Sequence, residues 1–152
     1  MAAMAPVKVD IKDAKGASIG SATISAVKTG GVSIALAVKG LEPGEHAFHI
    51  HSVAKCEGPA FTSAGGHFNP ESKKHGTMNP DGPHAGDMNN FTVTKAGVGS
   101  AKFTDTKVTL GDGANSLFGG TGTALVIHAK ADDMKTDPAG NAGARIACGP
   151  VQ

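Results

Sequence analysis

All seven histidines of the chain lie between positions 46 and 128, and imidazole side chains are common metal ligands. The segment from residue 46 to 51 reads HAFHIH, which is typical of a β-strand, where successive side chains point to opposite faces of the sheet. His49 and His51 are therefore expected to share one face, from which both rings can reach a single metal ion. His46 falls on the opposite face with the apolar residues, so we interpret it as a structural histidine of the core.

A second group of polar residues lies in sequence that has no periodicity. Three histidines and an aspartate fall within 21 residues there: His67, His75, His84 and Asp87. Their spacings, with Pro and Gly between them, suit a loop that folds around an ion. The segment LVIH ending at His128 places one more histidine on the face of a strand opposite Leu125 and Ile127. It can complete a site with His49 and His51 only if the two strands are close together.

A single histidine is more often a surface residue or a hydrogen-bonded core residue than a ligand, but this clustering favours a metal site. A site with only nitrogen donors fits Cu(II) in tetragonal geometry, whereas three histidines and one carboxylate fit tetrahedral zinc. Seven candidate ligands for two ions with four bonds each require one shared ligand. A doubly deprotonated imidazole can provide it, because each of its two nitrogens can bind a metal.

Short strands must position these residues, because the dominant period of the apolar pattern is 2. Val32, Ile34, Leu36 and Val38, for example, alternate with small or polar residues. Eight such segments are separated by turn residues, at 7–12, 19–28, 32–39, 46–52, 88–94, 99–104, 125–129 and 145–148. We therefore predict an all-β fold, an eight-stranded antiparallel β-sandwich or flattened barrel with two long functional loops, residues 52–87 and 132–144.

Composition excludes several other classes of protein. Of the 152 residues, 14 are basic and 13 acidic, and aromatics make up 4% with neither Trp nor Tyr. This balance argues against a nucleic-acid partner bound by charge and stacking rings. No apolar run approaches the roughly 20 residues of a membrane-spanning helix, so we expect no membrane insertion. The two cysteines, Cys56 and Cys148, allow one disulfide, two free thiols or two metal ligands.

Six segments together resemble the copper/zinc superoxide dismutases. They are GEHAFHIH (44–51), SAGGHFNP (63–70), KHG (74–76), HAGD (84–87), HAKADD (128–133) and GNAGARIACG (140–149). The resemblance extends over nearly the whole chain in the same order and spacing. It implies a single domain over residues 1–152 with the Greek-key β-sandwich of that family.

The resemblance also implies a role for each candidate residue. The copper ligands would be His49, His51, His67 and His128, and the zinc ligands His67, His75, His84 and Asp87, with His67 as the bridging imidazolate. Asp132 would link a copper histidine to a zinc histidine, although by itself it could also be the N-cap of a short helix. Arg145 would dock the anionic substrate, and Cys56 and Cys148 would form a disulfide.

The function implied by the resemblance is dismutation of superoxide to dioxygen and hydrogen peroxide by copper redox cycling, with one copper ion and one zinc ion per chain. Arg145 and His67 would be the catalytic residues, the first as a permanent positive charge and the second as a proton carrier. The alternative is a copper- or zinc-binding carrier on the same fold without catalytic turnover. A structural sandwich with incidental histidines is a third interpretation. A homodimer is compatible with all three.

The cellular location is also expected from the resemblance. Residues 57–62 make the stretch before Ser63 longer than in the cytosolic eukaryotic enzymes and similar to that of the bacterial exported branch. The chain begins MAAMAP, without a charged segment followed by an apolar one. We therefore expect a periplasmic or otherwise extracytoplasmic protein whose signal peptide is absent from this chain, rather than a cytoplasmic one.

Overall fold

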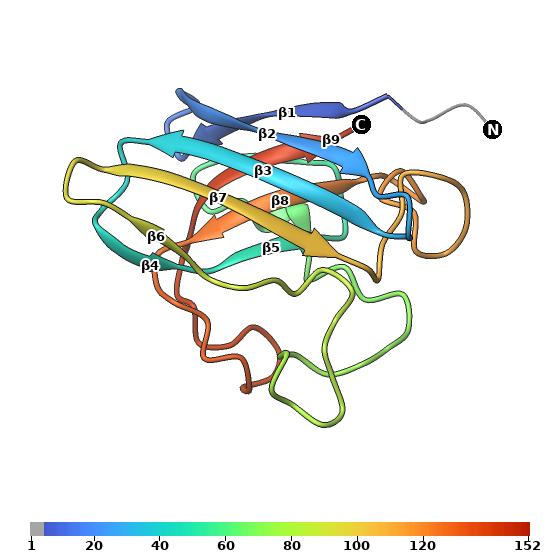
Figure 1. Cartoon of the computed structure of the whole chain (residues 1–152). Helices are drawn as coiled ribbons and strands as arrows, with labels where there is room; N and C mark the ends of the chain where they lie inside the picture. Colours follow the sequence, from blue (N-terminus) through green and yellow to red (C-terminus); the bar gives the residue numbers. More distant parts are fainter. Residues whose placement is uncertain (1–4) are drawn as a thin grey trace.

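The computed structural model describes residues 5–152, whose strands form one antiparallel sheet that curls into a nearly closed barrel (Figure 1). This part of the chain contains β1 (Val7–Asp13), β2 (Ser18–Ala26), β3 (Val32–Lys39), β4 (Gly44–His46), β5 (Phe48–His51), β6 (Phe91–Val93), β7 (Val98–Asp105), β8 (Thr123–His128) and β9 (Arg145–Val151), with one 3₁₀ turn at Thr62–Ala64. No helix within it is long and apolar enough to cross a bilayer. The expectation for the first four residues lies outside the described residues.

The order of strands across the sheet is β4-β6-β7-β3-β2-β1-β9-β8-β5. In β3 the alternation predicted from the sequence is clear, because Val32, Ile34, Leu36 and Val38 are buried while the residues between them are exposed or half-buried. The all-β antiparallel prediction is therefore confirmed. In Figure 1 the two long loops extend below the strands, on the side of β5, and lie outside the sheet.

The predicted number of eight strands is wrong, because the segment 46–52 forms two strands rather than one. It divides at Ala47, where β4 pairs with β6 and β5 pairs with β8. The N–H of Ala47 donates to the carbonyl of Lys130 at 2.9 Å, and its carbonyl accepts from the N–H of His128 at 3.0 Å. The division has a physical reason: β4 and β5 stand at the two ends of the strand order. The chain between them must therefore change neighbours where the barrel closes.

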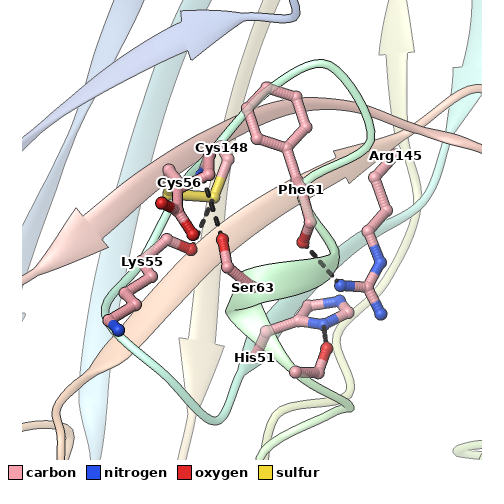
Figure 2. The surroundings of a disulfide bond; sticks show 9 residues. His51, Lys55, Cys56, Phe61, Ser63, Arg145 and Cys148 are labelled. Carbon is pink, nitrogen blue, oxygen red and sulfur yellow. Dashed lines mark hydrogen bonds between the residues drawn. A yellow bond between two sulfur atoms is a disulfide. The ribbon is translucent and has the colours of Figure 1, made fainter.

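A small second core covers the outer side of β8. Phe61 and Ala64 pack there against Ala124, Val126 and Cys148, separately from the main core inside the barrel. The sequence pattern left the Val126 side of this strand facing outward. Instead, all six residues of β8 are buried, because the loop that follows β5 covers that face. The Cys56–Cys148 disulfide fastens this loop to β9 (Figure 2).

The outer edge of β5 is covered by the long loop of residues 52–87. The N–H of Ile50 donates to Gly86 O at 2.9 Å, and its carbonyl accepts from the N–H of Phe68 at 2.7 Å. A Cβ at position 86 would overlap the carbonyl of Ile50, so only glycine permits this approach. The loop is thus tied to the strand that carries His49 and His51.

Candidate metal centre

Strand pairing brings three histidines to one side of the sheet. β5 and β8 pair with Phe48 opposite Ile127 and His51 opposite Ala124. The Nε2 atoms of His51 and His128 lie 3.4 Å apart, and the rings of His49 and His128 have centroids 4.8 Å apart. The strands that carry these histidines are therefore neighbours, which is the condition that the sequence analysis set for a shared site.

His67 joins these residues from the long loop. Its ring centroid lies 4.0 Å from that of His49 and 4.8 Å from that of His51. The four residues of this first group, which are those expected to bind copper, each offer a ligand atom within 4.8 Å of the others: His49, His51, His67 and His128.

The residues expected to bind zinc surround the other side of the His67 ring. Asp87 Oδ1 lies 2.9 Å from His67 Nδ1 and 3.1 Å from His75 Nδ1. His84 Nδ1 is 3.2 Å from His67 Nδ1 and 3.4 Å from Asp87 Oδ1. A second set of donor atoms that all lie within 4.8 Å of one another contains His49 with His67, His75 and Asp87. We call His67, His75, His84 and Asp87 the second group.

Two buried nitrogens show that these residues fit bound metal ions. Within residues 5–152, His49 Nδ1 and His67 Nε2 are buried and have no hydrogen-bond partner. Such atoms are rare in native proteins, because an unsatisfied buried polar group costs about 1–3 kcal/mol. Both belong to the first group, where a metal ion would satisfy them. His67 would then bind one ion through Nε2 and another through Nδ1.

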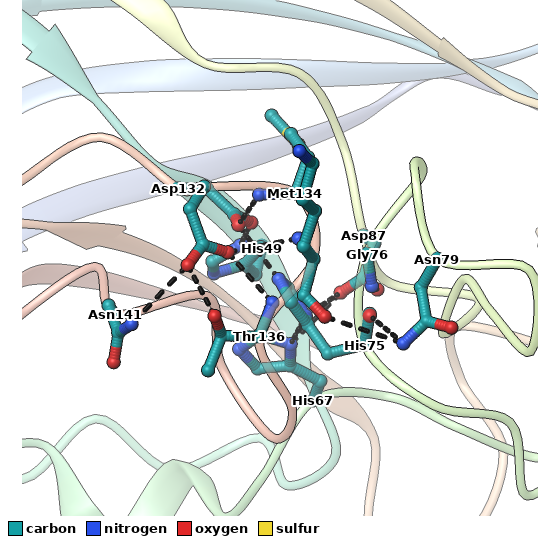
Figure 3. A network of polar contacts seen from close by, with 12 residues as sticks. His49, His67, His75, Gly76, Asn79, Asp87, Asp132, Met134, Thr136 and Asn141 are labelled. Carbon is teal, nitrogen blue, oxygen red and sulfur yellow. Dashed lines mark hydrogen bonds and ion pairs between the residues drawn. The ribbon is translucent and has the colours of Figure 1, made fainter.

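Asp132 connects the two groups (Figure 3). Its Oδ2 lies 2.6 Å from His49 Nε2, and its Oδ1 lies 2.8 Å from His75 Nε2. If each ring donates its N–H to this carboxylate, the Nδ1 atom of each ring is left with a lone pair for a metal. Asp132 begins no helix, so the geometry corresponds to the linking role implied by the resemblance.

Backbone carbonyls orient the two remaining histidines of the first group. His51 Nδ1 lies 2.8 Å from Gly65 O, and His128 Nδ1 lies 3.3 Å from Gly143 O. The Nε2 atoms of these rings, which lie 3.4 Å apart, are then the free donors. Sequence patterns cannot reveal such partners, because any residue type offers a carbonyl.

Burial keeps three rings of the first group neutral, those of His51, His67 and His128. It lowers the pKa of His51 to about 2 and, helped by the neighbouring His49 and other positive charges, that of His128 to about 3. Burial likewise lowers the pKa of His67 to about 4, although its hydrogen bond to Asp87 opposes this. A neutral imidazole has the lone pair that a metal ion needs.

The second group holds opposite charges instead. Burial alone would lower the pKa of His75, but hydrogen bonds to Asp132 and Asp87 outweigh it and raise the pKa to about 9. Burial would raise the pKa of Asp87, yet hydrogen bonds from three histidines, His67 first, hold it far below its usual range. The metal-free second group is therefore an ionic cluster, with a carboxylate ready to bind a cation.

Arg145 lies beside the first group. It is half-buried, and its Nη1 donates to the carbonyl of Phe61 at 2.8 Å (Figure 2). A cavity of about 420 Å³ is lined by Arg145 together with His51, His67 and His128. The predicted anion-docking residue thus faces the same space as three of the four residues of the first group. The disulfide joins the loop that carries Phe61 to the strand that carries Arg145.

The interpretation of His46 as a structural histidine is confirmed. Its ring is buried, with Nδ1 2.8 Å from His128 O and Nε2 2.7 Å from Glu42 O. It therefore supports the end of β8 through the backbone.

Sequence reasoning missed Asn90, whose side chain bonds both backbone groups of Asp132. Nothing in the spacing of this asparagine distinguishes it from an ordinary loop residue.

Comparisons with known proteins agree with this geometry. The sequence model of the copper/zinc superoxide dismutase family matches residues 18–151. "Superoxide dismutase [Cu-Zn] 1" of Aquifex aeolicus is 52% identical over 145 residues, which cover 94% of this chain and 85% of the relative. A crystal structure of a SOD-like protein from Bacillus subtilis has a TM-score of 0.92 at 36% identity, covering 95% of this chain and 97% of that one. The Cu/Zn superoxide dismutase of Brucella abortus has a TM-score of 0.77 at 25% identity, covering 97% and 100%. The chain belongs to the copper/zinc superoxide dismutase family.

Proposed function

We propose that this chain dismutates superoxide to dioxygen and hydrogen peroxide with one copper ion and one zinc ion. Copper would be held by the first group and zinc by the second, and His67 would bind both. The observation that carries the proposal is the His67 ring, whose Nε2 is buried and unpartnered while Nδ1 faces Asp87 at 2.9 Å. When bound, copper would supply one-electron redox chemistry for superoxide, while zinc would supply charge without redox chemistry.

Arg145 would bind the superoxide anion. The guanidinium carries a permanent positive charge and five N–H donors, and in the described part of the chain its side chain makes one hydrogen bond, to Phe61. That bond fixes the side chain at the wall of the cavity while other donors remain for an anion. The wall also carries His51 and His128, so an anion held there lies next to the first group.

His67 would hold the proton that peroxide formation needs at Nε2, while that atom is not bound to copper. Its Nδ1 lies 2.9 Å from Asp87 Oδ1 inside the second group, so proton exchange is confined to Nε2. The same ring lines the cavity with Arg145. A proton at Nε2 is therefore placed beside the anion, as general acid catalysis requires, rather than in bulk water.

Superoxide consumption by the metal-loaded chain tests the proposal. Wild-type protein with one copper and one zinc per chain should accelerate superoxide decay, and Arg145→Ala should keep both metals while lowering kcat/KM about 10-fold or more, because electrostatic steering raises capture by about 10–10³-fold. Arg145→Lys, which keeps the charge but not the fork of donors, should fall between them. Both metals bound with an unchanged rate of superoxide decay would overturn the proposal and favour the carrier.

We also propose an extracytoplasmic location. The Cys56–Cys148 disulfide supports it, because such bonds persist in oxidising compartments and are rare in the cytosol. Fractionation of the source cells, with detection of the protein by a specific antibody, tests this. Recovery in the cytosolic fraction with reduced cysteines would contradict it.

A further inference from the structure

We propose that Asn90 is a positioning residue that couples the two metal-binding groups by fixing the backbone of Asp132. The inference rests on the proposed metal assignment but not on catalytic turnover. It concerns a side chain that touches none of the expected ligands. It acts through Asp132, whose carboxylate contacts His49 of the first group and His75 of the second.

Asn90 replaces the hydrogen bonds that a neighbouring strand would give to Asp132. Its Oδ1 accepts from the N–H of Asp132 at 2.8 Å, and its Nδ2 donates to the carbonyl of Asp132 at 3.0 Å. Asp132 lies outside every described strand, so these two bonds satisfy the backbone groups that no ladder reaches. Asn90 itself is anchored, because it directly precedes β6 and is half-buried.

The carboxylate of Asp132 is fixed as a consequence. With the backbone held, only two side-chain torsions remain, and its contacts restrain both. Oδ2 lies 2.6 Å from His49 Nε2, while Oδ1 lies 2.8 Å from His75 Nε2 and accepts from Met134 N–H at 2.7 Å. Figure 3 shows the carboxylate directed at the two rings. A backbone displacement of about 1 Å away from either ring would stretch the contact to that ring beyond hydrogen-bond distance.

Gly140 closes the other side of Asp132. A Cβ at this position would overlap Asp132 Oδ1 and lie 2.7 Å from His75 Nε2. The φ angle of +75° also favours glycine there. Asp132 therefore lies between Asn90 on its backbone and Gly140 on its carboxylate, with little room to adopt another position.

The two groups depend on this arrangement to different extents. In the first group, His51 and His128 lie on strands and have their own carbonyl partners, Gly65 and Gly143, so only His49 relies on Asp132. In the second group every residue lies on a loop, and His75 relies on Asp132 for the orientation of its ring. Loss of Asn90 should therefore weaken zinc binding more than copper binding.

The test measures zinc and copper affinity separately in the full chain, without superoxide. Metal-free protein is titrated with zinc alone, and with copper alone, against a chromophoric chelator. Asn90→Ala should bind zinc about 10-fold more weakly, the lower end of the about 10–100-fold range for partners of a metal ligand, and copper less than about 3-fold more weakly. Co²⁺ in place of zinc should show an altered visible spectrum, which reports the ligand geometry directly.

Asn89→Ala is the matched control, since it removes the same side chain one position away at an exposed site. It should leave both affinities and the Co²⁺ spectrum unchanged. Asn90→Asp keeps the acceptor but removes the donor, so it should lose less zinc affinity than Asn90→Ala. It also replaces Asn90→Ala in the titrations if that variant does not fold. Circular dichroism identifies conditions in which every metal-free variant is folded. Under these conditions a loss of global stability cannot by itself change the measured metal affinities.

Unchanged zinc affinity in Asn90→Ala, or an equal loss in Asn89→Ala, would overturn the inference. So would an equal loss of copper and zinc. A chain that binds zinc in an Asn90-dependent way but does not consume superoxide would contradict only the proposed dismutase function.

Discussion

The strand-borne histidines and the loop-borne residues of this centre are held in place by different means. His49, His51 and His128 lie on β5 and β8, whose register fixes their relative positions through backbone pairing. The loop-borne residues are His75, His84 and Asp87. Asp87 forms an isolated backbone bridge with His49, and side-chain contacts with Asp87 and Asp132 position the two histidines. His67, also on the loop, lies between the two sets.

The two sets also differ in charge. Burial leaves the strand-borne rings of His51 and His128 neutral, with the pKa of His51 lowered to about 2, whereas carboxylates raise the pKa of His75 to about 9. The two sets share one imidazole, that of His67. The strands supply geometry that is fixed by register, while the loop-borne residues depend on contacts with one another and with Asp132.

The largest expected effect comes from breaking the strand-borne set with His128→Ala. Copper affinity should fall by more than about 100-fold, beyond the range seen for outer partners, because a ligand itself is removed. Superoxide consumption should fall to the background rate. Elemental analysis checks the loss of copper and a superoxide-decay assay checks the rate, with the zinc content of the same variant as the internal control. Undiminished copper in this variant would contradict the assignment.

A smaller effect on turnover is expected from Asp87→Ala, which breaks the loop-borne set. Removing the only carboxylate of the second group should release zinc and loosen the loop, while copper stays bound to the strand-borne histidines. Superoxide consumption should fall by less than about 10-fold, because zinc carries no electron. Asp81→Ala, an exposed residue of the same loop, is the matched control and should behave as wild type. Retained zinc in Asp87→Ala would refute this role.

The stability of the metal-free chain should also separate the two sets by its dependence on pH. His51, His67 and His128 have folded pKa values of about 2, 4 and 3 against 6.5 when unfolded, so unfolding takes up protons below pH 6.5. Stability should fall with acidification from pH 6.5 to 4.5, by up to about 1.4 kcal/mol per pH unit for each proton. His75 acts in the opposite direction, because its pKa is raised in the folded chain. Its contribution to stability is complete below pH 6.5 and is lost as the pH rises through about 9.

Urea denaturation of the metal-free chain at pH 5, 7 and 9.5 measures these changes. His75→Gln should remove the alkaline loss and leave the acid loss in place. Equal stability of the wild-type chain at pH 5 and 7 would show that the strand-borne rings are not held neutral.

The sequence was sufficient for the features set by local periodicity. Alternation placed His49 and His51 on one face and His46 on the other, and aperiodic sequence rich in Pro and Gly marked the loops. It could not show that β8 lies beside β5, because strand pairing depends on the whole topology. For the same reason, the division at Ala47 was missed: it reflects closure of the barrel rather than any residue preference.

The contacts around Asp132 lay further beyond prediction. Asn90 acts through a side chain on backbone groups 42 positions away, and such pairs leave no periodic signal. The single domain over residues 1–152 stays a prediction, and so does the homodimer. Sedimentation velocity would test whether the chain forms a homodimer.

The loop that covers the edge of β5 links metal binding to the tendency of the chain to aggregate. Gly86 and Phe68 occupy the hydrogen-bonding edge of this strand and belong to the same loop as His67, His75 and Asp87. An uncovered strand edge is a template for pairing with another molecule, and natural proteins protect such edges. Release of the loop would therefore expose Ile50 and its neighbours to other copies of the chain. Each bound zinc ion would thus guard against edge-to-edge aggregation, and zinc depletion should raise the tendency to aggregate before the barrel itself unfolds.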